Sequence, residues 1–272
     1  MLQTAVGEPL SRYVQQEHLK ANVDLQGSVL ALSGLKDGSI QLAIIAAPVG
    51  QTPAPAEFKT MLFCYQADYV MVNQANPLNA LDLRQVASVF GTVDQSSTLW
   101  GSLHLSAEWA ARPIVAYTTS TDDGVVLELF KNQALRGGSL KPTVHVMKTP
   151  QEMIKGVTDN ENAIGLGGFD PGTPDKVKVL QLSPAQTATP GAPTGAAAKG
   201  AVAATPENVL NGNYPLRLPY YLVFKPADKA RVLPLLIQLL GPDYTAHLRD
   251  EHFIPLPDTE RNRLLLELDK PN

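Results

Sequence analysis

The run TMLFCYQADYVMVNQANP, residues 60–77, constrains the fold more than any other stretch of the chain. It is rich in apolar, aromatic and β-branched residues, whereas strands in globular proteins are usually about 3–10 residues long. A run of this length predicts a strand that leaves one sheet and enters another. With 272 residues, of which 44% are hydrophobic, the chain can bury the core of one large domain or the cores of two lobes.

Strand-like and helix-like segments alternate on both sides of this run, which predicts an α/β fold with largely parallel pairing. Helical spacing over residues 79–91 ends at Gly91, and Pro150 opens a helix over residues 150–160. The other strand-like segments are LQTAV (2–6), VDLQGSV (23–29), IQLAIIAAP (40–48), RPIVAYTTSTDDG with its polar loop (112–124), PTVHVMKT (142–149), NAIGLGGF (162–169) and NYPLRLPYYLVFKP (213–226).

The first strand-like segment ends at Gly7, and Glu8 opens an amphipathic helix over residues 8–20. A glycine between a strand and a helix leaves the first backbone N–H groups of the helix free, and such groups bind anions such as phosphate. Glu8 places a carboxylate at that position. It either complements the helix dipole or marks a site that no longer takes an anion.

The charge pattern excludes several classes of partner. The net charge is −4 and no cluster of lysine or arginine occurs, so we expect neither nucleic acid nor an anionic membrane surface as a partner. No segment approaches the about 20 apolar residues of a membrane span. The N-terminus lacks the basic-then-apolar pattern of a signal peptide, which predicts a cytoplasmic chain or one whose leader has been removed.

Catalytic and metal-binding machinery is not visible in the sequence. Cys64 has no second cysteine to pair with, and the five histidines are scattered without a metal-ligand spacing. The serines and threonines of residues 118–121 have no histidine or lysine placed in the sequence to activate them. We therefore expect no catalytic residue, no metal, no cofactor and no enzymatic activity.

Residues 184–205 differ in composition from the rest of the chain. They consist almost entirely of alanine, proline, glycine and threonine, with Val202 as the one larger apolar residue. Such a segment cannot bury enough apolar surface to order itself. The sequence predicts a flexible Ala/Pro/Gly loop at residues 184–205.

The order of several short segments resembles that of a known family. An early glycine before a helix is followed by GLKDGSIQLAI, YVMVNQANPLNALDLRQVASVFG, LWGSL, ENAIGLGGF, GNYPLRLPYYLVF and LLIQLLGPDYTAHLRDEHFIPL. This succession resembles the phosphate-binding proteins of ABC transporters, which are periplasmic substrate-binding proteins. The resemblance covers nearly the whole chain apart from the Ala/Pro/Gly loop.

The resemblance implies a two-lobed α/β fold in which each lobe is a mixed sheet flanked by helices, with a cleft between the lobes. Lobe 1 would comprise residues 1–69 and 214–272, and lobe 2 residues 70–180. The implied function is capture of a small ligand, an oxyanion or another polar solute, by lobe closure. It further implies a periplasmic or secreted location and ABC-transporter membrane subunits, or another protein, as partners.

The family's ligand positions can be carried over to this chain one by one. Glu8 stands where the family has a serine or threonine just after the first glycine, Gly7. Gly27 and Ser28 keep part of the family's second loop, and Gln41 stands where the family has an aspartate. In the second lobe the family's Ser-Gly-Thr motif corresponds to Thr119, Ser120, Thr121, Asp122 and Asp123.

The acids at these positions allow three interpretations. Glu8 and the pair Asp122 and Asp123 can be ordinary capping and first-turn acids, which stabilise a helix start by about 0.5–2 kcal/mol. They can also line a cleft adapted to a cationic, amine-bearing or polyol ligand. In the third interpretation the chain binds an oxyanion through backbone N–H groups and hydroxyls.

Carboxylates close to a phosphate dianion would repel it by several kcal/mol at low dielectric. The alternative function is therefore an interaction or structural protein that keeps the fold without binding a ligand.

Overall fold

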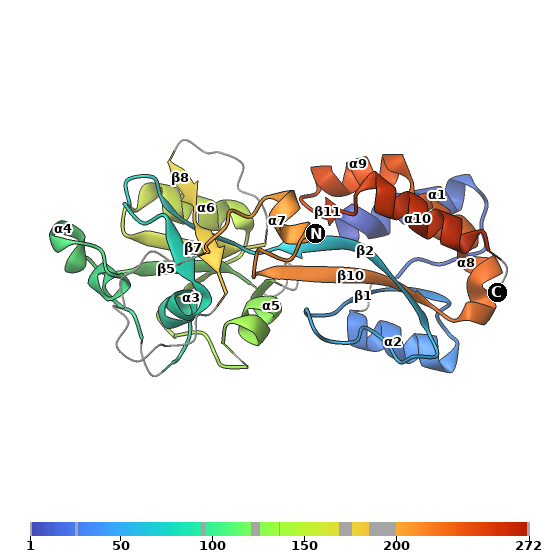
Figure 1. Cartoon of the computed structure of the whole chain (residues 1–272), viewed down its shortest axis with the longest axis horizontal. Helices are drawn as coiled ribbons and strands as arrows, with labels where there is room; N and C mark the ends of the chain where they lie inside the picture. Colours follow the sequence, from blue (N-terminus) through green and yellow to red (C-terminus); the bar gives the residue numbers. More distant parts are fainter. Residues whose placement is uncertain are drawn as a thin grey trace. The chain divides into compact units, whose positions relative to one another are not determined.

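The chain folds into two compact units in a computed structural model that describes residues 2–24, 27–93, 96–120, 126–135, 137–168, 176–184 and 200–270. Unit 1 comprises Met1–Gln66 and Leu218–Asn272, and unit 2 comprises Ala67–Arg217. The lobe boundaries expected from the sequence, near residues 69 and 214, remain a prediction. Figure 1 shows the elements of both units.

Unit 1 is built on a four-stranded sheet with the strand order β1-β10-β2-β11. β1 pairs with β10 in antiparallel register, from Leu42 opposite Phe224 to Ala46 opposite Tyr220. Leu35 from α2 and Ile45 from β1 are buried together in one apolar cluster of this unit. The elements are η1 (Gln3–Gly7), α1 (Glu8–Gln16), α2 (Ser28–Asp37), β1 (Leu42–Ala46), β2 (Lys59–Ala67), β10 (Arg217–Phe224), η4 (Pro226–Asp228), α8 (Lys229–Leu240), α9 (Pro242–Asp250), β11 (Ile254–Pro255) and α10 (Asp258–Leu268).

Unit 2 contains a five-stranded sheet with the order β6-β5-β7-β3-β8, and β4 pairs in parallel with β9. Helix α6 packs on β3, β5 and β7. The strands are β3 (Tyr69–Asn73), β4 (Ala80–Asp82), β5 (Val115–Thr119), β6 (His145–Met147), β7 (Ala163–Gly167), β8 (Val177–Val179) and β9 (Gln181–Ser183). The helices are α3 (Leu83–Phe90), η2 (Trp100–Leu103), α4 (Ala107–Ala110), α5 (Val126–Gln133), α6 (Pro150–Asp159) and α7 (Pro206–Leu210).

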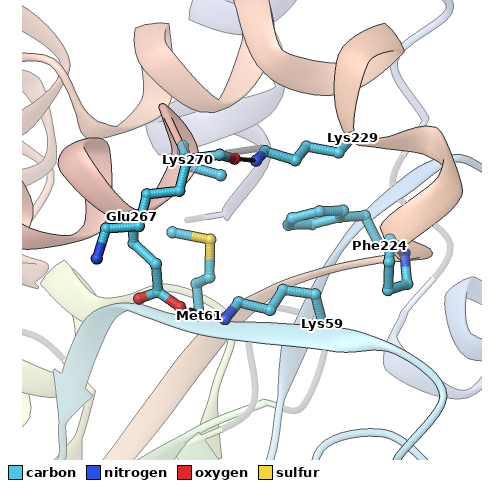
Figure 2. A pocket seen from close by; sticks show the side chains of 8 residues that line it. Lys59, Met61, Phe224, Lys229, Glu267 and Lys270 are labelled. Carbon is cyan, nitrogen blue, oxygen red and sulfur yellow. Dashed lines mark hydrogen bonds and ion pairs between the residues drawn. The ribbon is translucent and has the colours of Figure 1, made fainter. Parts of the chain in front are cut away.

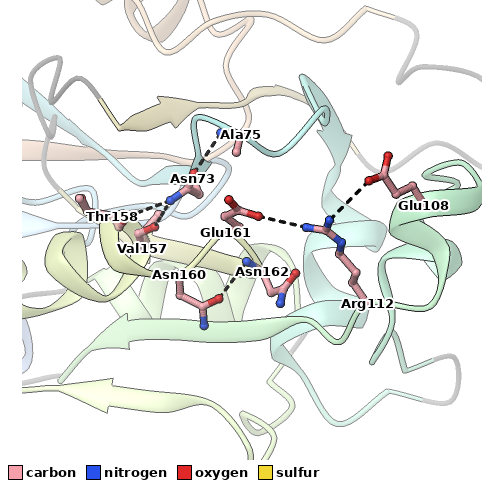
Figure 3. A network of polar contacts seen from close by, with 9 residues as sticks. All are labelled: Asn73, Ala75, Glu108, Arg112, Val157, Thr158, Asn160, Glu161 and Asn162. Carbon is pink, nitrogen blue, oxygen red and sulfur yellow. Dashed lines mark hydrogen bonds and ion pairs between the residues drawn. The ribbon is translucent and has the colours of Figure 1, made fainter.

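Helix α6 lies close to its sheet because β7 presents a glycine to it. A Cβ added at Gly165 would lie 2.6 Å from the Met153 sulfur and 2.9 Å from the Val157 side chain. Asn73 then fixes the end of the helix, since its Nδ2 donates to the carbonyls of Val157, at 3.1 Å, and Thr158, at 2.9 Å (Figure 3). These contacts hold α6 against β3 and β7.

A second polar group in the same view ties α4 to the loop before β7. The Arg112 guanidinium lies between Glu161, at 3.2 Å, and Glu108, at 3.9 Å (Figure 3). The same guanidinium lies 4.2 Å from the centre of the Trp109 ring, and that ring packs edge-on against Trp100 at 6.2 Å. Both tryptophans thus contribute to the packing of unit 2.

The long apolar run forms two strands in two sheets, as predicted. β2 belongs to the four-stranded sheet of unit 1, and β3 begins two residues later in the five-stranded sheet of unit 2. The helix predicted over residues 79–91 is present as α3 with Gly91 as its C-cap, but it begins only at Leu83, because Ala80–Asp82 form strand β4. Its start is a capping box, in which Asp82 accepts from the Gln85 N–H and Gln85 accepts from the Asp82 N–H.

Three expectations about secondary structure are wrong. LQTAV is not a strand, because Gln3–Gly7 form a π-helix that continues into α1. Val23 and Asp24 belong to no strand, and Ser28 already lies in α2. Pairing is not largely parallel, since both pairings described for unit 1 are antiparallel and unit 2 contains both kinds. The chain runs out of unit 1 along β2 and returns along β10, so these long strands do not come from β-α-β units.

The predicted loop at 184–205 lies largely outside the described residues. At its far end, Val202 exchanges two backbone hydrogen bonds with Leu182, at 2.9 and 3.0 Å. Thr205 caps α7 by accepting from the Asn208 N–H at 3.2 Å. The flexible loop at residues 184–205 remains a prediction.

Candidate ligand-binding site

The start of helix α2 has the geometry of an anion-binding helix terminus. Its N-cap, Gly27, has φ 80° and ψ 158°, and no side chain caps the helix. The first hydrogen bond of the helix runs from the Ala31 N–H to the Gly27 carbonyl at 3.0 Å. The three preceding N–H groups, those of residues 28–30, thus have no acceptor within the helix. They form the positive end of the helix dipole.

Ser28 adds a hydroxyl to these N–H groups. Its Oγ accepts a hydrogen bond from the Ala46 N–H at 3.0 Å, which holds the start of α2 against the end of β1. Because the oxygen acts as acceptor in this contact, the hydroxyl hydrogen remains free to donate elsewhere. We call this region, made by Gly27, Ser28 and residues 46–49, the α2 edge.

The α2 edge carries no charged side chain. Residues 27–31 and 46–51 contain neither acid nor base. Three aliphatic side chains stand out from it, Val29 at 84%, Leu30 at 58% and Val49 at 51% exposure. Among the described residues of this edge, the polar groups offered to a ligand are backbone groups and one hydroxyl, which suit a ligand oxygen but provide no counter-charge.

The second candidate edge lies in unit 2, at the carboxyl ends of β5 and β7. Thr119 ends β5 and is 3% exposed, while the Ser120 N–H donates to the Met147 carbonyl at 3.0 Å. Tyr69 at the start of β3 pairs with Gly167 at the end of β7, so Asp68 lies at the same edge. One strand separates Asp68 from Thr119, a spacing of about 10 Å. We call Asp68, Thr119 and Ser120 the β5 edge.

Asp68 is a fully buried acid that the sequence analysis did not single out. Its side chain has no exposed surface, and neither carboxylate oxygen has a hydrogen-bond partner among the described residues. Its backbone is held on both sides, because its N–H donates to Leu216 at 3.0 Å and its carbonyl accepts from the Tyr214 hydroxyl at 2.8 Å. Burial raises the pKa of Asp68 well above its ordinary value.

The signal for Asp68 was present in the sequence as a lone acid within the apolar run of residues 60–77. The prediction from that run concerns its strand character alone and assigns no role to the acid. The tyrosine beside this acid responds to it, since burial and the nearby Asp68 both raise the pKa of Tyr214. A buried, unpartnered acid is the usual mark of a functional or strained position.

Gly7 and Glu8 do not form the helix start expected of them. Gly7 lies in η1 with helical φ −60° and ψ −51°, and the Glu8 N–H donates back to the Gln3 carbonyl. The segment packs on α9, where the Tyr244 hydroxyl donates to the Val6 carbonyl at 2.8 Å. The Glu8 N–H is therefore engaged within the helix, and the Glu8 side chain is exposed.

Gln41 lies away from the α2 edge. It precedes β1, and its Nε2 donates to the Gly38 carbonyl at 2.9 Å. The α2 edge lies at the other end of this strand, about 17 Å further along. Thr121, Asp122 and Asp123 lie outside the described residues. Of the residues predicted to bind a ligand, the structure brings Gly27 and Ser28 together at one edge and Thr119 and Ser120 at another.

Comparison with known proteins identifies the class to which this fold belongs. Residues 2–240 match the family described as PBP superfamily domain, and the chain belongs to this family. It is 28% identical over 211 residues to the phosphate-binding protein PstS of Pseudomonas aeruginosa, covering 73% of this chain and 60% of that protein. The chain thus spans 60% of the length of this curated relative. Protein SphX of Synechococcus elongatus is 24% identical over 264 residues, covering 92% of this chain and 74% of SphX.

Solved structures show the same fold at lower identity. PstS from Borrelia burgdorferi superimposes with a TM-score of 0.72 at 14% identity, covering 94% of this chain and 95% of that one. An ABC-type phosphate transport receptor from Vibrio cholerae gives a TM-score of 0.69 at 20% identity, covering 93% and 96%. The relationship to phosphate-binding proteins of ABC transporters and the expected fold class are confirmed.

Among the described residues, no helix combines the length and the apolar character needed to cross a bilayer. In the same part of the chain, no three histidine, cysteine, aspartate or glutamate side chains lie close enough together to hold a metal ion.

Proposed function

We propose that this chain captures a small oxyanion or another polar solute by lobe closure, as the ligand-binding component of an ABC-type transport system. The observation that carries the proposal is the α2 edge, where free N–H groups of α2 and the Ser28 hydroxyl lie beside the end of β1. The family match and the relatives named as phosphate-binding proteins support it. The role is one of binding without catalysis, in a periplasmic or secreted location, with transporter membrane subunits as partners.

The charge distribution favours a ligand of low charge. The α2 edge offers no arginine or lysine to balance a phosphate dianion, and the β5 edge holds the buried acid Asp68. A dianion gains most from a fork of cationic donors, whereas a monoanion or a neutral polar solute can be held by N–H groups and hydroxyls. We therefore rank a singly charged oxyanion or a neutral hydroxylated solute above phosphate.

A thermal-unfolding screen with phosphate, sulfate, molybdate, sugars and polyamines tests this function. A ligand present at about 100 times its Kd should raise the free energy of unfolding by about 2.7 kcal/mol. A flat result across the panel would contradict solute capture. It would favour the alternative of an interaction protein, which the exposed Val29, Leu30 and Val49 could serve.

The α2 edge is tested with a matched pair of serines in one helix. Ser28→Ala removes the hydroxyl and should weaken binding of any ligand found in the screen about twofold to tenfold, the loss of one hydrogen bond. Ser33→Ala, an exposed position of the same helix, should leave the affinity unchanged. Equal affinities in both variants would place the site elsewhere.

A further inference from the structure

Unit 1 contains a pocket that the proposed function does not use. It has a volume of about 240 Å³ and lies between the start of β2, the end of β10, the start of α8 and the end of α10 (Figure 2). All of its lining residues belong to unit 1. The pocket is therefore complete within one unit.

This pocket is separate from the α2 edge. Phe224, which lines the pocket, pairs with Leu42 at the beginning of β1, whereas Ala46 at the α2 edge pairs with Tyr220. The two positions lie at opposite ends of the same pair of strands, about 14 Å apart along β1. A ligand of the size of this pocket cannot occupy both places.

The inner wall of the pocket is apolar. Met61 and Phe224 face it from β2 and β10 and are 2% and 1% exposed. In the view of Figure 2 the Met61 thioether and the Phe224 ring lie between Lys229 and Lys270 on one side and Lys59 and Glu267 on the other. Contact between this wall and the hydrocarbon part of a ligand is favourable, whereas the two side chains provide no hydrogen-bond donor and no positive charge for an inorganic anion.

The rim of the pocket is positively charged. It carries Lys59, Lys229 and Lys270 against one acid, Glu267. Glu267 forms an ion pair with Lys59, and the Lys229 ammonium donates to the Lys270 carbonyl (Figure 2). An ammonium has three donors, so each of these two engaged lysines keeps donors for a further acceptor.

Glu267 is one acid among three lysines in the lining of the pocket, and its surroundings stabilise its charged form. The hydrogen bond from Lys59 and the charge of that lysine lower the pKa of Glu267, and Arg263 and Lys270 act in the same direction. The Lys59 and Glu267 side chains are 42% and 38% exposed, so their pairing is screened by water and easily exchanged. A carboxylate entering the pocket can replace Glu267 as the partner of Lys59.

We infer that this pocket binds a small amphipathic carboxylate, with its anionic group at Lys59 and Lys229 and its hydrocarbon part on Met61 and Phe224. The volume equals that of about eight molecules of liquid water, which sets the ligand at about eight to ten non-hydrogen atoms. Short-chain fatty acids and aromatic carboxylates have this size and this division of character. The small contact area limits the affinity to the millimolar or high micromolar range.

Benzoate is the probe for the first experiment, followed by methyl NMR of the five methionines of the full chain. The Met61 methyl signal should shift and saturate with benzoate, because the ring lies against that side chain. Benzyl alcohol, which lacks the charge, and inorganic phosphate, which lacks the ring, should each shift it at least threefold less at equal concentration. An unmoved Met61 signal, or equal shifts from all three compounds, overturns the inference.

Two substitutions with opposite expected signs complete the test. Lys59→Gln removes one cation and should weaken benzoate binding about threefold to tenfold, whereas Glu267→Gln removes the competing acid and should strengthen it. Lys155→Gln in unit 2, which breaks the comparable exposed pair with Asp159, should leave the affinity unchanged. If both pocket variants weaken binding, or neither changes it, the pocket does not bind carboxylates in this way.

Discussion

The two candidate edges present different polar groups to a ligand. The α2 edge of unit 1 is uncharged and offers N–H groups and one hydroxyl, with exposed aliphatic side chains around them. The β5 edge of unit 2 offers hydroxyls beside a fully buried acid without a partner. The first can stabilise negative charge weakly at any pH. The second depends on Asp68, because burial keeps this acid protonated to a higher pH than an ordinary aspartate. Of the two edges, the β5 edge is therefore the one whose charge is expected to change with pH.

The largest effect is expected from Asp68, through the pH dependence of stability. Its folded pKa lies well above the ordinary aspartate value of about 3.9, so below about pH 4 the acid is protonated in both the folded and the unfolded chain and does not change the stability. As pH rises, the unfolded chain releases the proton and the folded chain keeps it. The free energy of unfolding should then fall by about 1.4 kcal/mol per pH unit until the folded pKa is passed.

Asp68→Asn removes the titrating carboxyl and should flatten the pH profile of urea unfolding between pH 4 and the folded pKa. Over that interval the free energy of unfolding of the variant should rise steadily relative to that of the wild type. Asp250→Asn, an exposed aspartate at the end of α9, serves as the matched control and should keep the wild-type slope. Parallel pH profiles for the wild type and Asp68→Asn would show that the pKa of Asp68 is not raised in the folded chain. The difference in pH response between the two edges would then disappear.

Gly27 provides the next largest effect, on the α2 edge. Its φ of 80° and ψ of 158° belong to a region that only glycine adopts readily, so Gly27→Asn should cost about 1–3 kcal/mol. Gly38 at the other end of α2 has φ 85° and ψ 4°, where asparagine is tolerated, so Gly38→Asn should cost less than about 1 kcal/mol. A Cβ added at either glycine has no other atom within 4 Å, so the difference in cost between the two variants reports the backbone conformations and not steric clashes.

Chemical denaturation of both glycine variants measures this difference. The Gly27 variant should also lose affinity for any ligand of the α2 edge, because a shift of this residue turns the free N–H groups away. Equal costs at the two glycines would show that the start of α2 is not held in this conformation.

A smaller effect is expected from Ser28→Ala. The substitution leaves the Ala46 N–H without its acceptor and should lower the free energy of unfolding by about 0.5–1.5 kcal/mol. Ser33→Ala in the exposed part of the same helix should change it by less than about 0.5 kcal/mol, toward greater stability, because alanine is the better helix former. Indistinguishable thermal unfolding of the two variants would mean that the Ser28 hydroxyl does not hold α2 to β1.

Most of the fold follows from local sequence signals. The apolar run of residues 60–77 is too long for one strand, and it forms β2 and β3 in separate sheets. The end of α3 follows from Gly91, whereas its start, where Asp82 and Gln85 form a capping box, lies four residues after the start expected from the helical spacing. Each of these signals depends on neighbours in the sequence, which is why it can be interpreted without the tertiary structure.

The candidate site was less predictable because its geometry depends on backbone conformation and register. Gly7 and Gly27 both precede a helical segment in the sequence, yet Gly7 is helical and Gly27 has a positive φ. Nothing local distinguishes the two glycines. Asp68 is visible as an acid in an apolar run, but only the pairing of Tyr69 with Gly167 places it at the β5 edge.

Glu8 should give the smallest effect, because it lies within a continuous helical segment and not at a helix start. An acid gains from the helix dipole only in the first turn, beside N–H groups without acceptors. The Glu8 N–H already donates to Gln3, so Glu8→Gln should change the free energy of unfolding by less than about 0.5 kcal/mol. It should also leave ligand affinity unchanged, since Glu8 is not part of either edge.

Glu152→Gln is the matched comparison for Glu8→Gln. Glu152 is also an exposed glutamate, but it lies in the first turn of α6 and its Oε2 accepts from the Lys148 N–H at 3.1 Å. Loss of its charge should cost about 0.3–1 kcal/mol, more at low salt than at high salt. If Glu8→Gln instead shows this cost and this salt dependence, the helical segment starts at Glu8 and does not continue from η1. The segment before it would then be the strand and turn that the sequence first suggested, and Gly7 would join Gly27 as a helix start open to a ligand.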